Sequence, residues 1–178
     1  MKSIASSPPC GSSVLGVDIG SVSSPIPFDE LNFSSHLFLT EIYEPQANCL
    51  RLVLREGKAS KFPVPIRVGG TDMGEGFPVE IDDSSATFQL DWNSYVLYQV
   101  LNESFGMAAD PSEVYEGKVA RRYTKSKLLQ FVMATTHATN EYPGKLLHYE
   151  LICGDHVVNV ICVELPQCLK FGPSPRIQ

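Results

Sequence analysis

No apolar run in this 178-residue chain approaches the roughly 20 residues that a membrane-spanning helix requires. The first segment, Met1–Ser13, carries one lysine followed by Ser, Pro and Gly, and it lacks the apolar stretch of a secretory signal peptide. Hydrophobic residues still make up 43% of the chain and charged residues 19%, an ordinary balance for a globule with a packed core. We therefore expect a cytoplasmic protein with no membrane partner.

Positive charge is scarce. Lys and Arg together number 14 against 20 Asp and Glu, which gives a formal net charge of −6. Nucleic-acid binding needs a concentrated positive surface, so no nucleic-acid partner is expected. The densest basic stretch, Lys118–Lys127, is interpreted as a solvated strand edge that leads into a helix. An acidic globule is suited instead to a basic protein partner, toward which charge steers it during association.

The cysteine pattern of a disulfide-bonded framework is also lacking, because the chain has an odd number of cysteines, five, and they are scattered along it. In a mid-sized chain without a secretory signal, reduced and mostly buried thiols are the expected state. The five are Cys10, Cys49, Cys153, Cys162 and Cys168.

The composition divides the chain into three parts. Residues 1–27 are rich in Ser, Pro and Gly and are interpreted as a flexible leader. Residues 28–166 carry the apolar patterns and are expected to form a single globular domain. Residues 167–178 contain two prolines and are interpreted as a frayed tail.

The clearest structural signal is a β-hairpin near the C-terminus. Two apolar-rich runs, Leu146–Cys153 and His156–Val163, flank the pair Gly154-Asp155, and such a pair between β-prone runs is typical of a two-residue turn. A two-residue turn fixes the register, because the numbers of paired residues must then sum to 309. The sequence therefore predicts that Glu150 faces Asn159.

Five further strands are predicted from alternating or continuous apolar patterns. Tyr95–Phe105 has apolar residues at both parities, which favours a central strand covered on both faces. Lys61–Asp83 is rich in Pro and Gly and is expected to be a long connection with at most short edge strands. The predicted strands cover residues 36–43, 48–55, 87–92, 95–105 and 118–124.

One helix is predicted, from Lys127 to about His137. Ser126 is a suitable N-cap, and apolar residues recur on one face. His137 would lie near the last carbonyls, where a positive charge is favoured. Strands in series with short turns and one helix predict an α+β, mainly β fold, with an antiparallel sheet or small β-sandwich against one packed helix.

Two parts of the sequence are similar to ligand-binding motifs. The segment Val14–Ser21 resembles a phosphate-binding segment of actin-like ATPases, but over eight residues in a chain too short and too β-rich for their two lobes. Cys153-x-x-His156 with Cys162 and Cys168 superficially supplies four zinc ligands. The hairpin register places Cys162 roughly 20 Å from His156 along the strand, whereas zinc ligands lie ~2.0–2.3 Å from the ion. No metal and no other cofactor is expected.

The candidate site residues lie on the polar face of the hairpin and at the end of a strand. Glu150 is opposite Asn159, and His148 is diagonal to Asn159, close enough for a polar cluster. A functional interpretation makes His148 a base oriented by Glu150. The favoured interpretation is a cross-strand hydrogen-bonded set. Asn102 and Glu103 follow a buried run and could cap a turn or line a recognition surface.

No catalytic nucleophile is expected. Ser104 lies at a strand end without the strand–turn–helix elbow that activates serine in hydrolases. Cys153 and Cys162 fall on the predicted core face, where thiols are usually inert.

Several blocks of sequence occur in order between Phe88 and Pro166, about half of the chain. Together they resemble a family of small, mostly uncharacterised bacterial proteins. The resemblance implies a bacterial, cytoplasmic setting and carries no established activity. Small acidic proteins of this sort are often immunity proteins in toxin systems. The blocks are Tyr98–Phe105, then Tyr123 with Ser126 and Leu129, then His148-Tyr149, then His156–Val160.

These observations favour a non-enzymatic protein-binding domain, of the bacterial toxin-neutralising immunity class, whose partner is a basic protein. Its expected binding surface consists of the polar candidate residues, which are His148, Glu150, Asn159, Asn102 and Glu103. The alternative is a small-molecule-binding protein or hydrolase that uses His148 and Glu150 with Tyr98 or Tyr149 in a pocket. A third possibility is an oligomer subunit that completes its sheet through an exposed edge.

Overall fold

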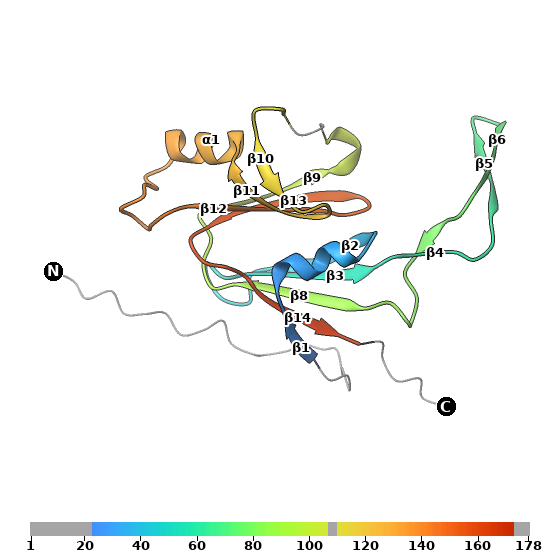
Figure 1. The fold of residues 1–178 in the computed structure, drawn as a ribbon, viewed down its shortest axis with the longest axis horizontal. Coiled ribbons are helices and arrows are strands. Elements are labelled where there is room, and N and C mark those ends of the chain that lie inside the picture. The colour runs from blue at the N-terminus through green and yellow to red at the C-terminus, as the bar shows by residue number, and fades with distance from the viewer. Residues whose placement is uncertain (1–22, 107–109, 173–178) are drawn as a thin grey trace.

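Two five-stranded antiparallel sheets pack face to face and carry one helix (Figure 1). The computed structural model describes residues 23–106 and 110–172. The predicted α+β, mainly β class is confirmed, with the sheets arranged as a small sandwich. Among these residues, no helix has the length and apolar character that crossing a bilayer demands.

The first sheet has the strand order β1-β14-β8-β3-β2. A 3₁₀ helix, η1 (Phe28–Phe33), links its first two strands in sequence. The strands are β1 Ser23–Ile26, β14 Gln167–Phe171, β8 Thr87–Trp92, β3 Leu50–Glu56 and β2 Leu37–Tyr43.

The second sheet has the strand order β10-β11-β12-β13-β9, with helix α1 (Lys127–Thr135) between β11 and β12 in sequence. A short 3₁₀ helix, η2 (Glu103–Phe105), follows β9. The strands are β10 Val114–Glu116, β11 Ala120–Lys125, β12 Leu147–Ile152, β13 His156–Cys162 and β9 Leu97–Asn102.

Two small antiparallel pairs lie between β3 and β8 in sequence. They are β4 Lys58–Ala59 with β7 Val79–Glu80, and β5 Val64–Val68 with β6 Thr71–Gly76.

The predicted hairpin register is confirmed. β12 and β13 are antiparallel, with Leu147 opposite Cys162 and Glu150 opposite Asn159. The predicted apolar face of the hairpin therefore points into the sandwich, where Tyr149 and Val160 are buried. Tyr149 lies against Trp92 of the other sheet with ring centroids 6.3 Å apart, so this aromatic contact spans the two layers within their shared core.

The turn glycine is required for space. Gly154 is not among the residues with positive φ, but a Cβ placed on it would lie 2.6 Å from the ring of Phe38 in β2. Its N–H also donates to the carbonyl of Leu37 at 2.8 Å. The turn between β12 and β13 in the second sheet therefore packs directly against β2, an edge strand of the first sheet.

The expected domain limits were too narrow. Ser23–Ile26, assigned to the leader, is β1, and Gln167–Phe171, assigned to the frayed tail, is β14. β14 is inserted between β1 and β8, so it pairs on both sides. The prolines that suggested fraying lie outside this strand. The remainder of the leader and of the tail, 1–22 and 173–178, lies outside the described residues.

Three further expectations need correction. β9 is an edge strand with mostly exposed residues, where a central strand covered on both faces was predicted. Helix α1 ends at Thr135, so His137 lies beyond it. The connection Lys61–Asp83 contains strands of five and six residues, β5 and β6, which are longer than expected.

The side chain of Asn32, in η1, fastens the turn between β10 and β11. Its Oδ1 accepts hydrogen bonds from the backbone N–H groups of Lys118, Val119 and Ala120 at 2.7, 3.0 and 3.0 Å. Its Nδ2 donates to the carbonyl of Ala120 at 2.9 Å. One amide thereby satisfies four backbone groups of a turn that is distant in sequence.

A buried ion pair joins β3 and β8. Arg51 donates to Asp91 twice, from Nε at 2.6 Å and from Nη2 at 3.0 Å, and the Arg51 side chain is 2% exposed. Gln89 adds a third donor to Asp91 at 2.8 Å. A buried pair of this kind is costly to break, because the remaining charge is left without compensation.

We expect Asp91→Ala to lower the free energy of unfolding by about 3–5 kcal/mol, since Arg51 would remain charged and buried. Urea denaturation followed by circular dichroism measures this. The matched control is Asp29→Ala, which removes an exposed partner 3.9 Å from Arg122 and should cost less than about 1 kcal/mol. Equal costs for the two substitutions would contradict the prediction.

Candidate functional site

His148 is the most completely enclosed of the sequence-predicted site residues. It lies on β12 with an exposed fraction of 3%. Its Nδ1 is 2.8 Å from Ser126 Oγ, and its Nε2 is 2.8 Å from Asn159 Oδ1 on β13. The predicted cross-strand set between His148 and Asn159 is therefore confirmed, and it also includes the N-cap of α1.

The hydrogen bonds around His148 define its charge state. The neutral ring with hydrogen on Nε2 donates to Asn159 Oδ1, while Nδ1 accepts from the Ser126 hydroxyl. Ser126 Oγ in turn accepts from the N–H of Leu129, which makes it the N-cap predicted from the sequence. Burial lowers the pKa of His148 below its ordinary value, although the hydrogen bond that His148 donates to Asn159 opposes this.

Glu150 binds different partners. Its Oε1 accepts from Arg121 Nη1 and from the Tyr123 hydroxyl, each at 3.0 Å. The Tyr123 ring stacks on His148 with centroids 4.4 Å apart and planes inclined by 17°. Burial, together with the Glu150 charge, raises the pKa of Tyr123 to about 12. Tyr123 thus contacts both the imidazole and the carboxylate, and Glu150 orients Tyr123 and Arg121.

Arg121 also packs on an aromatic ring. Its guanidinium carbon lies 4.4 Å from the ring centroid of Tyr115 on β10. The basic stretch predicted to be a solvated strand edge is therefore partly engaged in pairs within its own sheet. Arg122 is paired as well, at 3.2 Å from Glu116.

Asn102 and Glu103 lie apart from this cluster. Asn102 is opposite His156 in the β9–β13 register, whereas Asn159 is opposite Gln99. Three residues separate these positions, which corresponds to roughly 10 Å along a strand. The Asn102 side chain accepts from the N–H of Ser104 at 2.9 Å and caps η2, which is the turn-capping role considered from the sequence.

The thiols are enclosed in the core. The four cysteines in the described ranges are free and buried. Burial raises the pKa of Cys153, Cys162 and Cys168 to about 12, so each is protonated at neutral pH. No group of three or more His, Cys, Asp or Glu side chains gathers to hold a metal ion within residues 23–106 and 110–172. The motif Val14–Ser21 lies outside those ranges.

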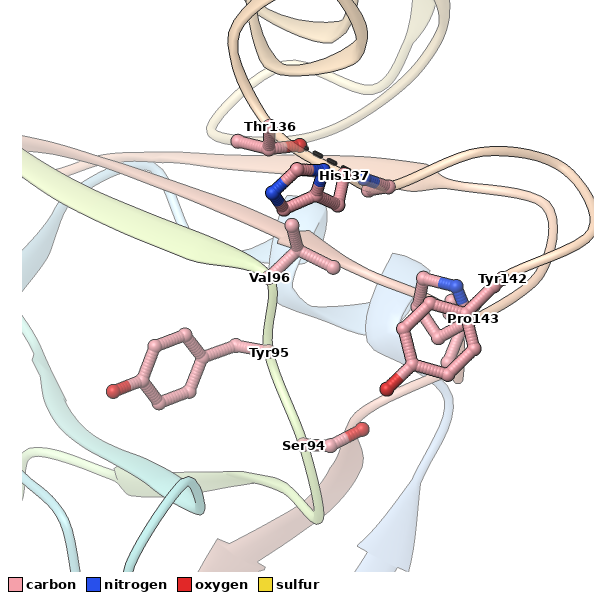
Figure 2. Close-up of a pocket in the computed structure, with 9 residues that line it drawn as sticks. Ser94, Tyr95, Val96, Thr136, His137, Tyr142 and Pro143 are labelled. Carbon is pink, nitrogen blue, oxygen red and sulfur yellow. Dashed lines mark hydrogen bonds between the residues drawn. The ribbon is translucent and has the colours of Figure 1, made fainter.

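A pocket of about 320 Å³ lies between the segment that precedes β9 and the segment that follows α1 (Figure 2). Figure 2 shows His137 and Thr136 beside Val96, and the ring of Tyr95 pointing away from them. The Thr136 hydroxyl donates to the carbonyl of Val132 and accepts from the N–H of Ala138, so both of its functions serve the helix end. None of the sequence-predicted site residues lines this pocket.

The β5–β6 hairpin projects away from the sandwich as an arm (Figure 1). We call Phe62–Phe77 the arm. Gly69 and Gly70 form its turn, with φ of 57° and 86°, as a type I′ hairpin turn requires. Large apolar side chains are exposed along it, and they are Phe62, Val64, Ile66, Val68, Met73 and Phe77.

Sequence reasoning missed the arm although a signal for it was present. Val64, Ile66 and Val68 alternate with Pro65 and Arg67, and the pair Gly69-Gly70 follows at once. The density of Pro and Gly favoured a loop and outweighed this alternation.

No protein-family model, no curated protein and no solved structure matches the chain.

Lowering the pH should destabilise the protein through His148. The pKa of the buried ring is depressed, so the unfolded chain takes up a proton that the folded chain refuses as the pH falls through about 6.5. The free energy of unfolding should therefore decrease as the pH is lowered. His148 should contribute at most about 1.4 kcal/mol of this decrease per pH unit. Urea denaturation of the wild type and His148→Gln over a pH series measures this contribution.

The His148→Gln variant should lose this part of the pH dependence. His36→Gln is the matched control, because His36 is exposed, and it should keep the wild-type profile. Parallel profiles for wild type and His148→Gln would refute the assignment.

Proposed function

We propose that the chain is a non-enzymatic protein-binding domain that acts in the bacterial cytoplasm and engages a basic protein partner through the arm. The observation that carries the proposal is the projecting β5–β6 hairpin with its exposed apolar side chains. The finer proposal is that the partner is a toxin and the chain its immunity protein. That step rests on the acidic composition and on the family resemblance.

The exposure of the arm is the first support. Val64, Ile66 and Val68 lie at alternate positions of β5 and so share one face of the hairpin. Val68 is 64% exposed, and Phe62 at the base of the arm is 77% exposed. Contiguous apolar side chains on a surface are characteristic of interaction sites. A two-stranded hairpin is also marginal in water by itself, so covering this face would stabilise it.

The charge around the arm is the second support. Residues 57–84 contain five carboxylates and three cations, within a chain of net charge −6. Asp72 and Glu75 lie on β6 opposite Arg67 and Pro65, on the other face of the hairpin from the apolar stripe, and both are exposed. A hairpin with an apolar stripe on one face and carboxylates on the other fits a partner that offers both an apolar patch and Lys or Arg side chains.

The alternative function receives less support. His148 is buried, and the Glu150 carboxylate is bound by Arg121 and Tyr123. Tyr149 is 1% exposed and lies in the sandwich core, so it is not open to a substrate. The pocket beside His137 contains none of these groups. A small-molecule ligand in that pocket would not reach the dyad that the hydrolase hypothesis invoked.

Replacing Ile66 and Val68 with Ser should abolish partner binding. The tagged full chain would capture its partner from a bacterial lysate, and the captured protein would then be titrated against purified wild type and variant. We expect the double substitution to raise the dissociation constant at least about tenfold, because truncating apolar anchors at an interface removes more than 1.4 kcal/mol. Added salt should weaken wild-type binding, as expected for a basic partner.

The matched control is Phe131→Ser with Met133→Ser on α1, since these side chains are equally apolar and exposed but lie outside the arm. This control should bind with wild-type affinity. Binding that survives the arm substitutions, or that is lost equally in the control, would exclude the arm as the interface.

A further inference from the structure

The two sheets present four edge strands, and three of them are protected against pairing. β1 carries Pro25, which has no N–H to donate. β2 is interrupted by a bulge between Leu39 and Glu41, and β10 has three residues and a bulge between Val114 and Tyr115. Proline, bulges, charge and shortness are the usual means of preventing edge-to-edge association.

The fourth edge strand, β9, has none of these features. It has six residues, and its register with β13 runs from Leu97 to Asn102 without a bulge. The strand contains no proline and no charged residue. In the described part of the chain, no strand pairs with its outer side. The described strands therefore leave this edge unpaired from Leu97 to Asn102.

The outward-facing backbone groups of β9 follow from the hydrogen bond next to its end. The N–H of Glu103 donates to the carbonyl of Asp155 at 3.1 Å. In an antiparallel ladder the bonded residues alternate, so Leu101, Gln99 and Leu97 also bond to β13. The N–H and C=O groups of the intervening residues point outward, and those residues are Tyr98, Val100 and Asn102.

Each face of this edge strand carries an exposed apolar side chain. Val100 is opposite Val158, which is buried in the core, so Val100 borders the inner face and is 42% exposed. Leu101 is opposite Val157 and borders the outer face, where it is 39% exposed. A strand added at this edge would cover both of these side chains.

We propose that β9 pairs with β9 of a second copy of this chain, which joins two five-stranded sheets into one antiparallel sheet of ten strands. The strand is uncharged, so an identical antiparallel partner meets no like charge along Leu97–Asn102. If Val100 of one copy lies opposite Val100 of the other at the two-fold axis, Tyr98 lies opposite Asn102. In this register the outward-facing N–H and C=O groups of all three residues find partners on the second copy. This surface is separate from the arm, so the proposal does not depend on the proposed function.

Sedimentation equilibrium of the full chain tests the pairing. Wild type should form a dimer whose population increases with concentration. Val100→Lys places two like charges opposite each other and should raise the dimer dissociation constant at least about tenfold. Val114→Lys is the matched control, since Val114 is an exposed valine on the protected edge of the same sheet, and it should dimerise as the wild type does.

A cysteine substitution tests the register and does not introduce a charge. Facing residues of a hydrogen-bonded antiparallel pair have Cα atoms about 5.5 Å apart, within the range that a disulfide spans. Under mild oxidation with oxygen and a copper catalyst, Val100→Cys should form a covalent dimer, while Val114→Cys should remain monomeric under denaturing electrophoresis. A wild type that stays monomeric at every concentration would overturn the proposal. So would a dimer unaffected by Val100→Lys, or equal cross-linking at both positions.

Discussion

The two-residue turn at Gly154-Asp155 determines where the side chains of the β12–β13 hairpin lie. It sets the register of β12 and β13, and the register assigns each side chain of the hairpin to the core or to the polar face. Tyr149 consequently reaches Trp92 across the sandwich, while His148 faces α1. The close approach of Phe38 to Gly154 ties this turn to the other sheet. A shift of one residue would place the polar set in the core and leave the aromatic contact in water.

The polar residues that first suggested chemistry serve to fix the helix on the sheet. Ser126 caps α1 and donates to His148, so the helix end and the second sheet share one hydroxyl. Tyr123 stacks on the imidazole and donates to Glu150. A fully bonded network of this kind specifies one arrangement of helix and sheet, because any other arrangement leaves buried groups unpaired. The two surfaces that we propose for binding, the arm and the edge strand β9, lie outside this network.

The features that could be predicted from the sequence are those that depend on residues close together in the chain. The hairpin register and the Ser126 cap depend on residues close in sequence, and both are confirmed. The edge position of β9 and the insertion of β14 beside β8 were not predictable, because they depend on pairing between distant segments. The polar set of His148 was predicted only across the hairpin. Its bond to Ser126 crosses 22 residues and a helix, and no spacing in the sequence indicates it.

The amide of Asn32 has a consequence for how the chain folds. It bonds to a turn 86 to 88 residues farther along the chain, so the loop between them must close before this turn is held. Closing a long loop costs entropy that later contacts must repay, and folds dominated by such distant contacts form slowly. The β10–β11 turn should therefore be fixed late, after the chain's beginning and middle have met. Until then the strand edges of both sheets are open to other chains.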